Sequence, residues 1–225
     1  MTVSPRLALF DCDGTLIDSQ HAIVGAMVAA FEAEGLDAPP PARVRRVVGL
    51  SLVEAVAVLL PEGAPALHKL LAEHYKTAFQ RQRQAGLHRE PLFPGLRAAL
   101  EALEGEGVLM GVATGKSMRG LRAALELHDL GRFFVTLQTA DVGPGKPDPD
   151  MVFRAQAESG AETAGTVMIG DTVYDIEMAC RAGVGAVGVS WGYHGVDELR
   201  AAGAHRIADS GDEIVAAVLG LLARP

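Results

Sequence analysis

Two carboxylates occupy alternate positions near the N-terminus, where Asp11 and Asp13 follow the apolar run 7–10. An uninterrupted apolar run of this kind is typical of a strand buried on both faces of a parallel sheet. Side chains at i and i+2 of an extended chain point the same way, so the two carboxylates can share one side of the strand end. At about 4 Å they would repel by about 4 kcal/mol if the effective dielectric constant is near 20. Either one of them is protonated or a cation lies beside them, and further carboxylates downstream favour the cation.

Three more polar features follow apolar runs or precede helical segments. Thr114 and Gly115 come after one such run, Lys146 lies in the stiff loop 145–149, and Asp171 and Asp175 flank the start of a helical segment. Alone, each feature has a simpler explanation as a helix cap, a surface lysine or a turn. Ligands in open α/β sheets bind outside the carboxyl ends of the strands, so we expect these groups to meet at one edge of a sheet.

The segment after residue 91 alternates between apolar strands and helices. This rhythm predicts an α/β fold, a doubly wound parallel sheet of Rossmann-like type with helices on both faces. The expected strands are 7–10, 108–113, 133–137, 166–169, 184–189 and 205–208, and the expected helices are 96–104, 117–127, 150–158, 174–181, 197–201 and 212–222.

The segment between the first strand and residue 91 has a different pattern. It contains no strand-like alternation between residues 20 and 90. Its expected helical stretches are 20–34, 43–48, 52–60 and 66–84, and they are separated by Gly35, Pro41, the break at 49–51, Pro61 and Pro65. We therefore expect an inserted all-helical cap over residues 18–91. The α/β core is then formed by residues 1–17 and 92–225.

The composition restricts the class of protein. The chain has 225 residues, 49% of them hydrophobic, a net charge of −8 and two cysteines. The acidic balance argues against a nucleic-acid partner, and two cysteines are too few for a disulfide framework. The longest apolar runs are too short to span a bilayer, and no secretory signal is recognisable. We expect a soluble cytoplasmic protein.

Taken together, the motifs resemble those of the haloacid dehalogenase (HAD) superfamily. The segment 11–19, DCDGTLIDS, resembles the first motif of that family, and Thr114, GKPDP at 145–149 and GDTVYD at 170–175 resemble the next three. The helical insert resembles the C1 type of cap, so the resemblance covers the whole chain. It implies a phosphatase that works through an aspartyl-phosphate, with a small phosphorylated metabolite as its partner. We expect a monomer or a homodimer.

The resemblance also assigns roles to the core residues. Asp11 would be the nucleophile, and Asp13 would protonate the leaving oxygen and then take a proton from the attacking water. Mg²⁺ would bind a carboxylate oxygen of Asp11, the backbone carbonyl of Asp13 and a carboxylate oxygen of Asp171, with Asp175 holding a metal-bound water or orienting the ligands. In addition, Lys146, Thr114 and Gly115 would bind the phosphoryl oxygens.

The layout is similar to that of phosphoglycolate phosphatases. Arg45 and Arg46 of the cap are candidates for binding a substrate carboxylate, although a solvated helix face is the simpler explanation of each. Sugar-phosphate phosphatase, pyrophosphatase and phosphoglucomutase-like activities remain open, although Ile23 stands where β-phosphoglucomutase-like sequences carry a histidine. A phosphonoacetaldehyde hydrolase would need a lysine near the entry of the cap. The lysines of the cap, Lys69 and Lys76, lie much later in the sequence, which makes this alternative weak. A binding module that has lost catalysis is the distant alternative.

Overall fold

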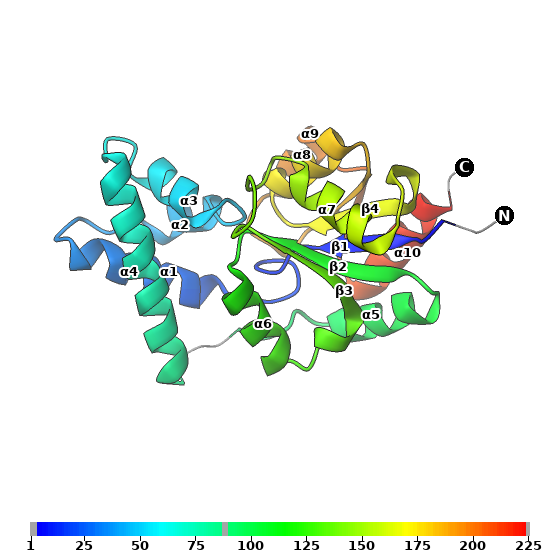
Figure 1. Ribbon diagram of the computed structural model, residues 1–225, viewed down its shortest axis with the longest axis horizontal. Helices are drawn as coiled ribbons and strands as arrows, with labels where there is room; N and C mark the ends of the chain where they lie inside the picture. The colour runs from blue at the N-terminus through cyan, green and yellow to red at the C-terminus, as the bar shows by residue number, and fades with distance from the viewer. Residues whose placement is uncertain (1–3, 87–89, 224–225) are drawn as a thin grey trace.

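A parallel sheet forms the centre of the computed structural model, which describes residues 4–86 and 90–223 (Figure 1). Its six strands lie in the order β3-β2-β1-β4-β5-β6, and all neighbouring strands are parallel. The strands are β1 Leu7–Phe10, β2 Leu109–Thr114, β3 Phe134–Thr139, β4 Thr166–Gly170, β5 Gly185–Val189 and β6 Arg206–Ala208. After β1 the chain forms β2 and β3 on one side of it, and then β4, β5 and β6 on the other side. The strand order therefore reverses between β1 and β4, and ligand sites form at such topological switch points.

Helices cover both faces of this sheet, which confirms the predicted doubly wound fold (Figure 1). Alternate residues of β1 face opposite sides: Ala8 and Phe10 belong to one buried apolar cluster, and Leu7 and Leu9 belong to the other. The first cluster includes side chains from α5 Leu96–Gly105, α6 Met118–Leu127 and α10 Gly211–Leu222. The second includes side chains from α7 Asp150–Ser159, α8 Val173–Ala182 and α9 Val196–Ala201. Two short 3₁₀ turns, Gly131–Phe133 and Thr163–Gly165, precede β3 and β4.

Four helices from the segment after β1 form a separate lobe beside the carboxyl ends of the strands (Figure 1). They are α1 Gln20–Ala33, α2 Pro41–Arg46, α3 Leu52–Leu59 and α4 Pro65–Gln84. They enclose an apolar cluster of their own, which includes Ile23, Met27 and Val56. We call this lobe the cap. The chain crosses into and out of it side by side, because the amide of Asp18 donates to the carbonyl of Pro91 at 2.8 Å. The boundaries at 17/18 and 91/92 stay predictions.

Two cap helices begin earlier than the sequence pattern indicated. We expected helical segments from residues 43 and 66, whereas α2 begins at Pro41 and α4 begins at Pro65. The first helical position needs no amide donor, so a proline that normally interrupts a helix can begin one. No helix among residues 4–86 and 90–223 is long and apolar enough to cross a membrane.

Candidate active site

Three predicted groups meet at the carboxyl ends of adjacent strands. Asp11 follows β1, Thr114 ends β2 and Asp171 follows β4, and these three strands are neighbours in the sheet. Asp175 lies in the first turn of α8, directly after the Asp171 loop. The central strands of the sheet thus bring residues from distant parts of the sequence to one place.

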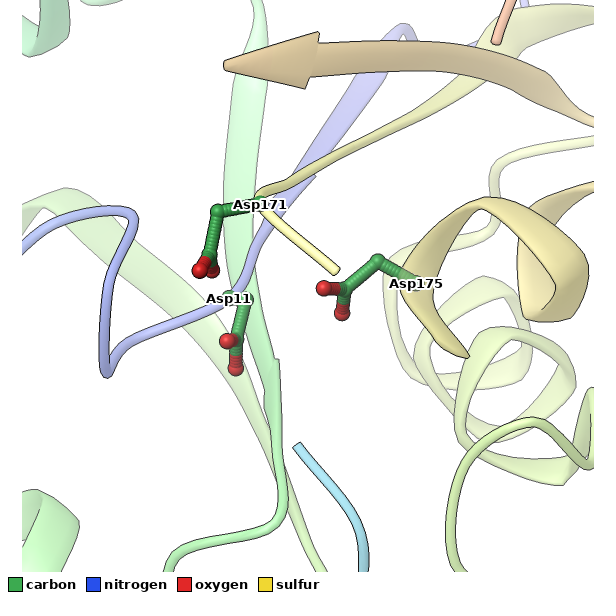
Figure 2. A group of neighbouring side chains, drawn as sticks. All are labelled: Asp11, Asp171 and Asp175. Atoms are coloured by element: carbon green, nitrogen blue, oxygen red, sulfur yellow. The ribbon is translucent and has the colours of Figure 1, made fainter. Parts of the chain in front are cut away.

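The carboxylates of Asp11, Asp171 and Asp175 form a buried cluster (Figure 2). One oxygen from each lies within 4.8 Å of the others. Figure 2 shows that the three side chains come from two strand ends and one helix start, and that their carboxyl groups gather beyond the strand ends. All three residues are at most 1% exposed.

Lys146 balances part of this charge. Its Nζ lies 2.7 Å from Oδ1 of Asp11 and 2.6 Å from Oδ1 of Asp175, and its side chain is fully buried. Burial alone would lower the pKa of Lys146, but the two carboxylates outweigh burial and hold that pKa above its ordinary value. Burial raises the pKa of Asp11 to about 6, against the opposing effect of Lys146. Burial also raises the pKa of Asp171 well above its usual range.

Hydrogen bonds fix the orientation of the other two carboxylates. Asp171 accepts from the Thr15 hydroxyl at 2.9 Å and from the backbone amide of Tyr193 at 2.9 Å. The second oxygen of Asp175 accepts from the amide of Thr172 at 3.0 Å and from its hydroxyl at 2.7 Å. These two hydrogen bonds cap the N-terminus of α8. They fix the side chain of Asp175 so that its other oxygen, Oδ1, faces Lys146.

The cluster fits a divalent cation bound through oxygen. Three carboxylates face one ammonium, so two negative charges remain when all are ionised. Oδ1 of Asp11 lies against the Lys146 ammonium, whereas its buried Oδ2 accepts no hydrogen bond from any described residue. A buried carboxylate oxygen without a donor is costly unless a cation lies beside it. An oxygen-only set of donors suits Mg²⁺, and these three carboxylates could hold such an ion.

Asp13 belongs to a second polar group beside the cluster. Its Oδ1 accepts from the Ser19 hydroxyl at 2.6 Å, and Lys116 Nζ lies 2.7 Å from Oδ1 and 3.0 Å from Oδ2. Lys116 is also 3.6 Å from a carboxylate oxygen of Glu90, at the return from the cap. These contacts hold the Asp13 side chain apart from Lys146 and in contact with residues that connect core and cap.

Thr114 and Gly115 form the floor of the site where the cap approaches the core. Thr114 is buried, and its hydroxyl accepts from the amide of Lys116 at 3.2 Å. A Cβ at Gly115 would lie 2.6 Å from the carbonyl oxygen of Leu50 and 2.8 Å from that of Gly49, so a larger residue would push the cap away. The contact places the predicted break at 49–51 directly over the floor.

A cavity of about 520 Å³ lies between the cap and the core. Asp11, Asp13 and Thr114 line it from the core side, together with Gly115 and Lys116. Helices α1 and α4 and the loop before α3 supply most of the opposite wall. The candidate nucleophile and the candidate acid therefore open into one space.

The cap arginines lie elsewhere. Arg46 forms a bidentate pair with Glu198 of α9 at 2.7 and 2.8 Å, on the outer surface. Its backbone carbonyl accepts from the Tyr174 hydroxyl at 3.2 Å, and His194 Nε2 lies 3.1 Å from the same oxygen. Neither Arg45 nor Arg46 is among the described residues that line the cavity. Arg46 instead joins the cap to the core.

The site also uses residues that sequence patterns alone did not identify. Tyr193 lies in a turn after β5, and its amide orients Asp171 across the sheet edge. A Cβ at Gly192 would lie 2.0 Å from that of Asp171, so the turn passes very close to the carboxylate. Lys116 directly follows the predicted Thr114 and Gly115, and it pairs with Asp13, which lies 103 positions away in the sequence. Such contacts depend on the sheet order, and no local spacing could predict them.

Comparisons with known proteins agree with this geometry. A family model described as haloacid dehalogenase-like hydrolase matches residues 8–189. The chain is 36% identical over 224 residues to "Probable phosphatase IndB" of Dickeya dadantii, covering 96% of this chain and 94% of that protein. It is 33% identical over 193 residues to a phosphoglycolate phosphatase of Pseudomonas fluorescens, covering 84% and 71%. A crystal structure of a hydrolase from Pseudomonas syringae has a TM-score of 0.84 and 28% identity, covering 96% and 98%.

Proposed function

This chain belongs to the haloacid dehalogenase-like hydrolase family and is a phosphatase, and we propose that it is Mg²⁺-dependent and hydrolyses a small phosphate monoester through a phosphorylated Asp11. One observation carries the proposal. The Asp11 carboxylate is buried, lies 2.7 Å from Lys146, and lines the same cavity as Asp13.

Two half-reactions follow from the positions of Asp11 and Asp13. An oxygen of Asp11 attacks phosphorus while the bond to the leaving oxygen breaks, and Asp13 gives that oxygen its proton. Water then attacks the same phosphorus, gives a proton to Asp13, and releases phosphate as the bond to Asp11 breaks. One carboxylate nucleophile thus divides a difficult displacement into two easier ones, and one acid serves both.

The surrounding residues supply the charge and the donors. Lys146, the Thr114 hydroxyl and the backbone amide of Gly115 would bind phosphoryl oxygens and stabilise the charge that develops on them. Asp11 and Asp171 would hold Mg²⁺, with the carbonyl of Asp13 as a further ligand and Asp175 orienting the group. When bound, the ion supplies positive charge to the transferring phosphoryl group.

For the substrate, the names of relatives support phosphoglycolate as the first ester to assay. Sugar phosphates, pyrophosphate and a phosphoglucomutase-like transfer remain as alternatives. Arg45 and Arg46 remain predicted substrate ligands only if the cap moves, because Arg46 pairs with Glu198 in this structure. A cytoplasmic location and a monomeric or dimeric state also stay predictions.

The proposal is tested by phosphate release from a panel of monoesters. We expect release with Mg²⁺, loss of release with EDTA, and recovery when Mg²⁺ is added back. The rate of phosphate release should be lower in Asp11→Asn by more than about 10⁴-fold for every ester, since the substitution removes the nucleophile. A thermal melt that matches the wild type shows that the variant is folded. Turnover that survives in folded Asp11→Asn would mean that another group is the nucleophile.

A further inference from the structure

The cap side of the cavity is mostly apolar, although Gln80, Arg83 and Gln84 of α4 also line it. Its wall includes Ile23 and Met27 of α1, Val47, Leu50, and the rings of Tyr75 and Phe79 on α4. Ile23, Met27 and Val47 also belong to the buried apolar cluster of the cap, and the two rings pack against it. The cavity is therefore continuous with a packed hydrophobic core. Whatever part of a substrate lies beyond the phosphoryl group would contact this wall.

The size of the cavity exceeds what a small acid needs. Its volume of about 520 Å³ lies in the range of pockets that enclose drug-sized ligands. A two-carbon acid such as glycolate would occupy a small part of it and leave most of the apolar wall in contact with water. Removing apolar surface from water stabilises a complex roughly in proportion to the area covered, so an occupant that covers the wall gains most.

The buried cations of the wall already have partners. Lys116 pairs with Asp13 at 2.7 Å, and Arg83 lies 3.2 Å from a carboxylate oxygen of Glu90. Both side chains are mostly buried, at 8% and 29% exposure. A substrate carboxylate would have to compete with these internal carboxylates for either cation. The other two cations among the described residues that line the cavity are exposed: Lys76, which pairs with Glu73 at 2.8 Å, and Arg119. The buried part of the wall thus favours an uncharged group over a second acid.

Two aromatic rings give this wall a flat surface. The rings of Tyr75 and Phe79 are stacked, with centroids 5.7 Å apart and planes inclined by 27°. Lys116 Nζ lies 5.0 Å from the centroid of the Phe79 ring, so one ammonium contacts both that ring and Asp13. An occupant that extends from the phosphoryl group would therefore pass Asp13 and meet the aromatic surface.

We propose that the cavity binds the alcohol portion of the substrate, and that this portion is a bulky, mainly apolar group of at least the size of one aromatic ring. The proposal rests on the proposed phosphatase activity and specifies its substrate class. It makes the cap wall, above all Phe79, the determinant of which ester is hydrolysed.

The direct test compares esters whose leaving alcohols have nearly the same acidity. For ethyl phosphate and 2-phenylethyl phosphate, we expect kcat/KM to be at least tenfold higher for the larger ester, and higher than for phosphoglycolate. Their non-hydrolysable counterparts, propylphosphonate and 3-phenylpropylphosphonate, should inhibit with the same order of affinity, which reports binding without chemistry. Equal or lower values for the larger ester and the larger inhibitor would overturn the proposal.

Phe79→Ala locates the preference. The variant should lose most of the advantage of 2-phenylethyl phosphate, measured as the ratio of kcat/KM for this ester to kcat/KM for ethyl phosphate. Phe79→Leu should restore part of the preference, since it returns apolar surface to the wall. Phe153→Ala is the matched control, because Phe153 is a 48% exposed ring on α7, outside the cavity. If folded Phe79→Ala keeps the full preference, the wall assigned to the substrate is wrong.

The outcomes separate this proposal from the phosphatase proposal. If phosphoglycolate is hydrolysed best and Asp11→Asn abolishes that activity, the phosphatase proposal stands and the apolar substrate class is rejected. If no ester is hydrolysed with Mg²⁺, or if Asp11→Asn stays active, the proposed mechanism fails. Titration calorimetry of the two phosphonates then still reports whether the cavity binds apolar groups, because it needs no turnover.

Discussion

The two sides of the cavity have opposite physical characters. On the core side, Asp11 and Asp175 share Lys146 within 2.7 Å, and these side chains are fully buried or nearly so. On the cap side, the wall consists mostly of aliphatic and aromatic carbon, including Met27 and Phe79. Charge in a buried site stabilises a phosphoryl group of any ester, whereas apolar surface distinguishes one alcohol from another. The reaction and the choice of substrate are therefore assigned to different lobes of the molecule.

This comparison predicts that changes in the core affect all esters alike. Asp13→Asn should reduce turnover by about 10²–10⁴-fold, since it removes the proton donor and acceptor while keeping the shape of the side chain. The factor should be the same for ethyl phosphate and 2-phenylethyl phosphate in steady-state assays. A loss confined to one of these esters would show that Asp13 selects the substrate, and the division between the lobes would then be wrong.

Removing the buried ammonium tests how the carboxylates depend on it. Lys146→Met should lower turnover by about 10²–10³-fold, because a donor to the phosphoryl oxygens is lost. It should also lower the free energy of unfolding of the metal-free protein by about 3–5 kcal/mol, since the carboxylates lose their buried partner. Chemical denaturation measures this change, and Lys69→Met, at an exposed position of α4, is the control. Equal stabilities of the two variants would contradict the account.

Stabilisation of the protein by Mg²⁺ should depend on residues of the core side and not on residues of the cap wall. At a Mg²⁺ concentration of about 100 Kd, binding adds about 2.7 kcal/mol to the free energy of unfolding, and the melting temperature should rise. Asp171→Asn should abolish the rise, because the carboxylate that Thr15 and Tyr193 orient would lose its charge. Phe79→Ala should keep it. An unchanged Mg²⁺ response in Asp171→Asn would remove Asp171 from the predicted ligands.

The smallest effect is expected where cap and core meet on the surface. Glu198→Gln breaks the bidentate pair with Arg46, whose two side chains are 45% and 47% exposed. Exposed pairs contribute about 0–1 kcal/mol, so kcat/KM should change less than about threefold for small and large esters. Steady-state kinetics at two salt concentrations measures this. A large loss would mean that the pair controls closure of the cap.

The core residues of the site were predictable because each of them lies in a short sequence pattern that marks a strand end or a helix start. Asp11, Asp171 and Lys146 each follow an apolar strand or precede a helix, and the carboxyl ends of parallel strands meet at one edge. The predicted fold and the assembly of these groups therefore needed no knowledge of distant contacts. Helix starts were less predictable, since Pro41 and Pro65 begin helices that they seemed to interrupt.

The cap wall was not predictable in the same way. A periodic apolar face predicts that a helix buries side chains, but not whether Phe79 meets another side chain or a cavity. The cap arginines suggested a carboxylate ligand, whereas Arg46 pairs with Glu198, 152 residues away. The Lys116 contact with Asp13 likewise depends on the adjacency of β1 and β2. Residue type identifies the reacting groups, and only the three-dimensional arrangement identifies their neighbours.

The central claim is that Asp11 carries the phosphoryl group during turnover. The most direct measurement is rapid acid quenching of the Asp13→Asn variant with a ³²P-labelled aryl phosphate, whose leaving group needs little protonation. The label should accumulate on the protein, be released by hydroxylamine as expected for an acyl phosphate, and map to the peptide that contains Asp11. Label that is absent under these conditions, or that persists when Asp11 is also replaced by Asn, would contradict the account.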